Sequence, residues 1–149
     1  MKTCHLFGLI LCIMLLPALD GQERNPCWDT AKSQREMNEC AGAELKAAED
    51  ALDRVYQRVR KQHADDKVFV GRLEAAQRAW AAFRDAELEA IFPKHGEPLE
   101  YGSVYPMCYA GWKTTLTTER TKQLRRWVDA VEEGNVCARS LLIRKESKK

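Results

Sequence analysis

The sequence predicts an all-α protein, a small disulfide-stapled bundle of about three amphipathic helices. Three long segments carry apolar residues at the three- and four-residue spacing of one helix face. No segment shows the strict apolar and polar alternation of a half-buried strand, and the β-branched residues are scattered. Amphipathic helices in one small chain bury their apolar faces against one another, which gives a bundle.

Residues 1–21 are predicted to be a cleavable secretory signal. A positively charged start and an apolar run over residues 6–16 precede a polar stretch, which is the usual layout of such signals. The run is too short to span a bilayer as a helix. We place cleavage after Gly21, with Ala18 as the alternative, and expect a periplasmic or secreted protein. Lipid attachment at Cys12 is disfavoured, because a leucine precedes it where such a site needs a small residue.

The remainder is predicted to form one helical domain, residues 22–138, followed by a basic tail, residues 139–149. The tail carries five cationic residues and one carboxylate, so we expect it to be a solvated, disordered end. The domain carries 18 Lys and Arg against 20 Asp and Glu. Its mild acidity and predicted export argue against a nucleic-acid partner.

The first long helix is predicted from Ser33 to about Gln62. Ser33 and Glu36 have the spacing of a capping box, and the two aspartates at 65–66 end the helix. A coiled-coil dimer is the alternative, but the apolar face covers only about three heptads and is rich in alanine. The predicted core face comprises Met37, Ala41, Leu45, Ala48, Leu52, Val55 and Val59.

The second helix is predicted from a cap at Asp66 to Phe92. It ends there because the residue before Pro93 disfavours helical geometry. The predicted core face comprises Phe69, Leu73, Ala76, Trp80, Phe83 and Ala90.

A loop is predicted over residues 93–102, which contain two prolines and two glycines. The third helix is predicted from about Ser103 to Glu133, with Pro106 in its first turn and Gly134 as a stop. The predicted core face comprises Tyr105, Tyr109, Trp112, Leu116, Arg120, Leu124, Trp127 and Val131.

Four cysteines follow the predicted signal, and an even number in an exported chain indicates two disulfides. We expect the pairs Cys27–Cys40 and Cys108–Cys137. The second pair requires the chain to return along the third helix, either through a break at Gly111 or through a shorter helix. The spacings match no zinc site, so we expect no metal. A redox pair would need a C-x-x-C spacing, which is absent.

Asp53, Arg84, Asp85 and Arg120 are charged residues on or beside apolar faces. A buried guanidinium needs a carboxylate or several carbonyls. We therefore expect structural ion pairs, with Asp53, Asp85 or Glu119 as the partner of Arg120. The alternative is a polar patch that faces another protein.

The sequence indicates that the protein is not an enzyme and has no cofactor. His63 and His95 do not lie beside a serine or cysteine in a recognisable nucleophile arrangement. The chain also lacks an H-E-x-x-H pattern and a glycine-rich phosphate loop.

A set of spaced residues resembles the pattern of a known family. The landmarks are Cys27, residues 33–41 (Ser-Gln-Arg-Glu-Met-Asn-Glu-Cys-Ala), Leu52-Asp53-x-x-Tyr56, Gln77-x-x-Trp80-x-x-Phe83-Arg84-Asp85, Cys108, and Leu116-Thr117-x-x-Arg120-x-x-x-Leu124. Together they resemble the LprI-like lysozyme-inhibitor family of secreted bacterial proteins, of the N-terminal-domain type. The resemblance implies a small helical exported domain and, for the family's namesake, inhibition of lysozyme.

One position departs from the family pattern. The family often continues R-D-A-E-C, and that cysteine would pair with the later one. Here Leu88 stands in its place, and Cys137 appears beyond the third helix. The resemblance therefore implies that the second disulfide has been rewired.

We expect an exported binding protein that inhibits a lysozyme-type muramidase by occluding it. Lysozymes are commonly basic and the domain is mildly acidic, so the attraction has the right sign. The alternatives are a non-inhibitory envelope or cell-wall interaction protein and an immunity protein against a wall-degrading toxin. The expected binding residues lie in the predicted loop: Glu97, Leu99, Glu100 and Tyr101.

Overall fold

The computed structural model describes residues 25–97, 100–129, 131–132, 137, 141 and 143–144, and within them the predicted all-α fold is confirmed. The predicted signal lies outside the described residues. The elements in order are α1 (Cys27–Thr30), α2 (Gln34–Gln62), α3 (Lys67–Ile91), α4 (Tyr105–Val128), β1 (Val131–Glu132) and β2 (Ile143–Arg144). The two short strands pair in parallel, with Val131 opposite Ile143. None of the described helices is long and apolar enough to cross a membrane.

The caps predicted for α2 and α3 are confirmed. The Ser33 hydroxyl accepts a hydrogen bond from the Glu36 N–H, and the Glu36 carboxylate accepts one from the Ser33 N–H. The Asp66 carboxylate accepts from the Phe69 N–H at 2.9 Å. Each contact satisfies a backbone donor that the first helical turn leaves unpaired. The two helices therefore begin where the sequence places them.

The predicted extent of α4 is wrong at its C-terminal end. The helix ends at Val128 instead of Glu133, because Asp129 takes an extended conformation. Further helix would have placed Asp129, Glu132 and Glu133 at the negative end of the helix dipole, whereas the actual last turn holds two arginines. Gly111 lies within the continuous helix, so the predicted break there is absent.

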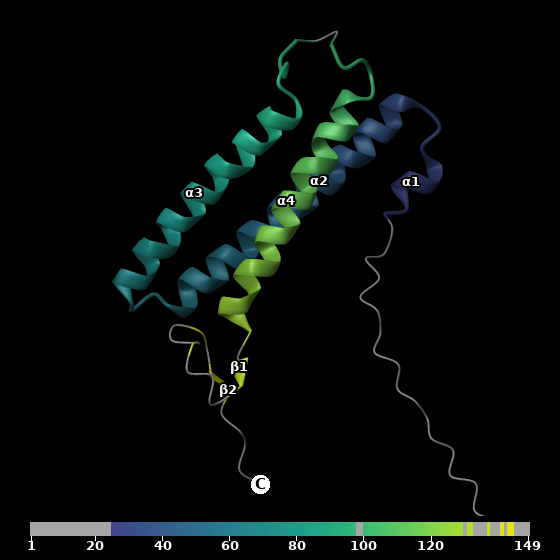
Figure 1. Cartoon of the computed structure of the whole chain (residues 1–149). Coiled ribbons are helices and arrows are strands. Elements are labelled where there is room, and N and C mark those ends of the chain that lie inside the picture. Colours follow the sequence, from purple (N-terminus) through teal and green to yellow (C-terminus); the bar gives the residue numbers. More distant parts are fainter. Residues whose placement is uncertain are drawn as a thin grey trace, which may run out of the picture.

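Helices α2 and α4 run side by side in the same direction (Figure 1). Helix α3 connects them in the chain and runs in the opposite direction. A buried cluster of Leu52, Val59, Leu73 and Leu124 joins all three. Trp80 and Trp127 are among the partly buried residues that pack against this cluster. This cluster lies toward the end of the bundle where α2 turns into α3. Further residues are buried toward the other end: Cys40, Ala41, Leu88, Phe92 and Ala110.

The predicted faces of α3 and α4 are wrong at two aromatic residues. Phe83 is 55% exposed and Trp112 is 50% exposed. The residues of α4 that are buried are mostly small: Ala110, Thr117, Thr121 and Leu124. Small side chains let α4 approach α2 closely, so the large aromatic residues are left for the sides of the helix.

Candidate functional site

The family-like residues of α3 form a cluster with α4, here called the Trp80 cluster (Gln77, Trp80, Arg84 and Arg120). The guanidinium of Arg84 lies 5.2 Å from the centroid of the Trp80 ring, and that of Arg120 lies 5.9 Å away. Arg120 Nε donates to Gln77 Oε1 at 3.0 Å. The cluster thus connects α3 and α4 through cation–π contacts and a charge-assisted hydrogen bond.

The predicted carboxylate partner of Arg120 is wrong. Its guanidinium donates to the side-chain oxygens of Gln77 and Gln123, at 3.0 and 3.2 Å. Burial lowers the pKa of Arg120 below its ordinary range. Asp53 is exposed and accepts a hydrogen bond from Gln57 in its own helix. Two amide oxygens and the face of the Trp80 ring therefore stabilise Arg120, where the sequence predicted an ion pair.

Arg84 and Asp85 do form an ion pair, but within one helix. The Arg84 guanidinium lies 2.7 Å from the Asp85 carboxylate, and the Arg84 side chain is 17% exposed. Because the two residues are adjacent in sequence, the pair orients the arginine over Trp80 and does not link two helices. The Trp80 cluster is therefore a structural contact between α3 and α4.

The predicted Cys27–Cys40 disulfide is confirmed, with the two Cα atoms 5.6 Å apart. The predicted Cys108–Cys137 bridge is wrong, because Cys108 is a free thiol. Cys108 lies in the first turn of α4, and the unbroken helix places it about 30 Å by helix rise from the last turn, from which the chain leaves toward Cys137. Leu88, which stands at the family's cysteine position, is buried.

The loop between α3 and α4 is held down by an aromatic cluster of five rings. Its members are Phe92, His95, Tyr101, Tyr105 and Tyr109. His95 stacks on Tyr109 at 4.9 Å, and its Nδ1 forms a hydrogen bond with the hydroxyl of Tyr105. Burial, and then charge repulsion from the phenol groups of Tyr109 and Tyr101, raise the pKa of Tyr105. These ring contacts therefore pack the described parts of the loop against the start of α4.

The predicted binding residues of this loop have different environments. Glu97 is exposed. Glu100 forms an ion pair with Lys94 at 2.6 Å. The Tyr101 hydroxyl accepts from the Lys94 N–H at 3.0 Å, and its ring packs on Phe92 and Tyr105. Leu99 lies outside the described residues. Tyr101 thus packs against the bundle, and its contact with a partner stays a prediction.

Charge is distributed unevenly along the bundle. The loop end, residues 84–101, carries five carboxylates and two cationic side chains. The carboxylates are Asp85, Glu87, Glu89, Glu97 and Glu100. In contrast, α4 carries five cationic side chains and one carboxylate, and its C-terminal half points away from the loop (Figure 1). We refer to residues 84–101 as the acidic end.

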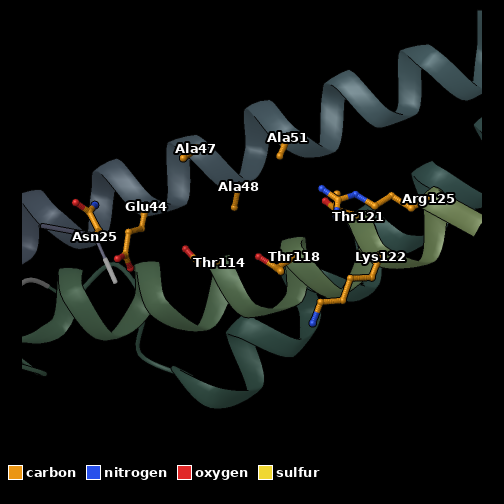
Figure 2. Close-up of a pocket in the computed structure, with 10 residues that line it drawn as sticks. All are labelled: Asn25, Glu44, Ala47, Ala48, Ala51, Thr114, Thr118, Thr121, Lys122 and Arg125. Atoms are coloured by element: carbon orange, nitrogen blue, oxygen red, sulfur yellow. The ribbon is translucent and has the colours of Figure 1, made fainter. Parts of the chain in front are cut away.

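A groove of about 500 Å³ lies between α2 and α4 (Figure 2). Alanines of α2 and threonines of α4 line its middle. Asn25 and Glu44 lie at one end, and Lys122 and Arg125 lie at the other. None of the sequence patterns pointed to this groove, because small residues on a helix face read as ordinary packing positions.

The described residues contain no group of three or more His, Cys, Asp or Glu side chains arranged to hold a metal ion.

Comparison with known proteins gives two matches. The family model described as "Lysozyme inhibitor LprI" matches residues 27–124, which include α1 to α3 and most of α4. The chain is also 35% identical over 137 residues to "Uncharacterized protein R02472" of Rhizobium meliloti (strain 1021). The aligned region covers 84% of this chain and 94% of the relative. No solved structure matches the chain.

Proposed function

The chain belongs to the LprI lysozyme-inhibitor family, and on that basis we propose that it is exported, binds a lysozyme-type muramidase and inhibits the enzyme by occluding it. The family is named for inhibition and not for catalysis, which agrees with the expectation that the chain is not an enzyme. The predicted signal at residues 1–21 supports export to the periplasm or beyond the cell.

The acidic end is the observation that carries the proposal for the binding surface. Lysozymes are commonly basic, so a concentration of carboxylates at one end of the bundle attracts and orients the enzyme. Glu87, Glu89 and Glu97 are all exposed there. The basic C-terminal half of α4 points away, so the protein has one end that attracts a basic partner and one that repels it.

An exposed aromatic residue supplies the apolar anchor that charge alone does not. Phe83 lies next to the acidic end and is 55% exposed, whereas its family-motif neighbours Trp80 and Arg84 contact each other. Aromatic side chains at the centre of an interface contribute most to binding. Phe83, with Glu87 one turn further along α3, therefore joins the predicted loop residues in the proposed surface.

The aromatic cluster beneath the loop lowers the cost of binding. The described parts of the loop, residues 93–97 and 100–104, lose less conformational freedom on contact with a partner where they already pack on the bundle. Tyr101 and Glu100 serve this purpose through their contacts with Phe92 and Lys94. The Glu97 N–H donates to the Lys94 carbonyl at 3.0 Å, and the loop presents the exposed Glu97 side chain to the enzyme.

The test is to add the mature protein to a basic lysozyme and to follow both complex formation and clearing of a cell-wall suspension. We expect a complex that co-elutes in gel filtration, and slower clearing that saturates near one inhibitor per enzyme. A complex without slower clearing would support the non-inhibitory envelope protein instead. Absence of any complex with lysozymes of several classes would overturn the proposal.

A further inference from the structure

The groove between α2 and α4 has opposite charges at its two ends, joined by a neutral, small-residue floor (Figure 2). Its volume of about 500 Å³ is in the range of small-ligand sites in proteins. The lining comes from α2, α4 and Asn25, and contains no residue of the acidic end. The groove is thus separate from the proposed lysozyme surface.

Hydrogen bonds and a disulfide hold the Glu44 end of the groove in place. Trp28 Nε1 donates to Glu44 Oε1 at 2.5 Å, and the Asn25 side-chain oxygen accepts from the Cys27 N–H at 3.0 Å. The disulfide from Cys27 to α2 fixes the segment that carries these groups. A carboxylate can accept about four hydrogen bonds, so Glu44 keeps acceptor capacity for a ligand cation. The arrangement resembles a preorganised amine site.

The cationic end lies in the last turns of α4. Lys122 and Arg125 both line the groove. Lys122 forms an ion pair with Glu119 at 2.8 Å, and both side chains are more than half exposed. Exposed pairs of this kind are weak, so Lys122 can exchange partners readily. Arg125 offers a planar fork that suits a carboxylate.

The floor offers hydroxyl groups and little bulk. Ala48 and Ala51 of α2 face Thr118 of α4 across the middle (Figure 2). Thr114 Oγ1 is buried and has no hydrogen-bond partner among the described residues. Thr121 Oγ1 donates to a backbone carbonyl and keeps its own lone pairs. Both of these hydroxyl groups are enclosed by the protein, so the hydroxyl of the partly exposed Thr118 is the one that meets a ligand lying flat on the floor.

We propose that this groove binds a short extended peptide with free ends, its amino group at Glu44 and Asn25 and its carboxylate at Lys122 and Arg125. From Thr114 to Arg125 the helix rises about 16 Å, which matches four or five extended residues at about 3.3 Å each. The peptide groups meet the hydroxyl of Thr118, and the alanine methyl groups leave room for the peptide backbone. The inference goes beyond lysozyme inhibition and does not depend on it.

The test titrates the isotope-labelled mature protein with tetra-alanine and follows the backbone amide signals. We expect saturable shifts confined to residues along the groove. N-acetyl-tetra-alanine and tetra-alanine amide should each bind several-fold more weakly, because each lacks one charged end. Shifts that lie elsewhere, equal binding of the three peptides, or no saturation by about 10 mM peptide would overturn the proposal.

Two variants assign the ends. Arg125→Gln should weaken binding of tetra-alanine several-fold and leave binding of tetra-alanine amide unchanged. Glu44→Gln should also weaken binding of tetra-alanine several-fold, and should leave binding of N-acetyl-tetra-alanine unchanged. The matched control is Arg126→Gln, an exposed neighbour on α4 that does not line the groove. If Arg125→Gln weakens the acid and the amide equally, the carboxylate does not lie at this end. Lysozyme inhibition, measured on the same variants, should be unchanged, so failure here and failure of the proposed function are distinguishable.

Discussion

At the scale of single residues, Arg120 shows how a charged side chain can be stabilised without a carboxylate. Its guanidinium combines two amide acceptors with the face of Trp80. Both acceptors are neutral amide oxygens, and the bond to Gln77 joins α4 to α3. Two of the family-like residues on α3, Gln77 and Trp80, are the partners that Arg120 contacts there.

We predict that Arg120→Ala lowers the free energy of unfolding by about 1–3 kcal/mol, the range for losing a hydrogen bond to a charged group and a partly shielded cation–π contact. Arg126→Ala, on an exposed position of the same helix, should change it by less than about 0.5 kcal/mol. Urea denaturation of both variants provides the measurement. Equal stability of the two variants would show that the Trp80 cluster contributes nothing to folding.

A second residue-scale prediction separates core from contact surface among the aromatic residues. Trp80→Ala should destabilise the bundle by about 2–4 kcal/mol, because Trp80 packs against the core cluster. Phe83→Ala should leave the melting temperature nearly unchanged, because Phe83 is exposed, and should weaken lysozyme binding. Thermal melts beside titration calorimetry test this. A clear loss of stability in Phe83→Ala would show that Phe83 packs in the core and is not part of the contact surface.

The sequence could not reveal this difference between Trp80 and Phe83. Residues three and four apart share one face of a helix, so a row through Trp80 continues equally well to Phe83 or to Arg84. The buried Leu88 continues the row through Arg84, which leaves Phe83 at the edge. Hydrophobicity alone predicts that Phe83 continues the buried row. In the structure Arg84 takes that place and makes a cation–π contact with Trp80.

At the scale of elements, local chemistry determined what could be predicted. The starts of α2 and α3 follow from Ser33 and Asp66, whose side chains bond to backbone groups three residues away. The pairing Cys27–Cys40 is also local in sequence. The end of α4 and the state of Cys108 depend on contacts between distant segments, and both predictions were wrong.

The capping box of α2 makes a prediction about pH. Hydrogen bonds from the Lys32 and Ser33 backbone and the Ser33 side chain lower the pKa of Glu36 below its ordinary value of 4.5. A lowered pKa in the folded state means that the contact stabilises the fold above that ordinary value, and that the contribution is lost as the pH falls from about 4.5 through the folded-state pKa.

The measurement is the melting temperature as a function of pH for Glu36→Gln and for a control, Glu39→Gln, whose carboxylate forms only an exposed pair with Arg35 at 3.8 Å. Glu36→Gln should melt lower than the control at neutral pH, and the gap should narrow below pH 4.5. A gap that stays constant down to pH 2 would mean that ionisation of Glu36 plays no part in the cap.

At the scale of the whole molecule, charge is separated along the length of the bundle. The acidic end and the basic half of α4 lie at opposite ends of one bundle. The sequence indicated a mildly acidic domain but not this separation, because it appears only when α3 and its loop are placed against α4. An elongated molecule with such a distribution approaches a basic enzyme with a preferred orientation.

The most direct test of this claim compares two variants with the same change in net charge. Glu87, Glu89 and Glu97 are replaced together by Gln at the acidic end, and Asp53, Asp65 and Asp129 are replaced together by Asn as the control; all six carboxylates are exposed. Titration calorimetry against a basic lysozyme, at low and at high salt, gives the affinities. We predict that the acidic-end variant binds roughly tenfold more weakly than the control at low salt, and that the difference shrinks as salt screens the charges. Equal affinity of the two variants at low salt would contradict the account.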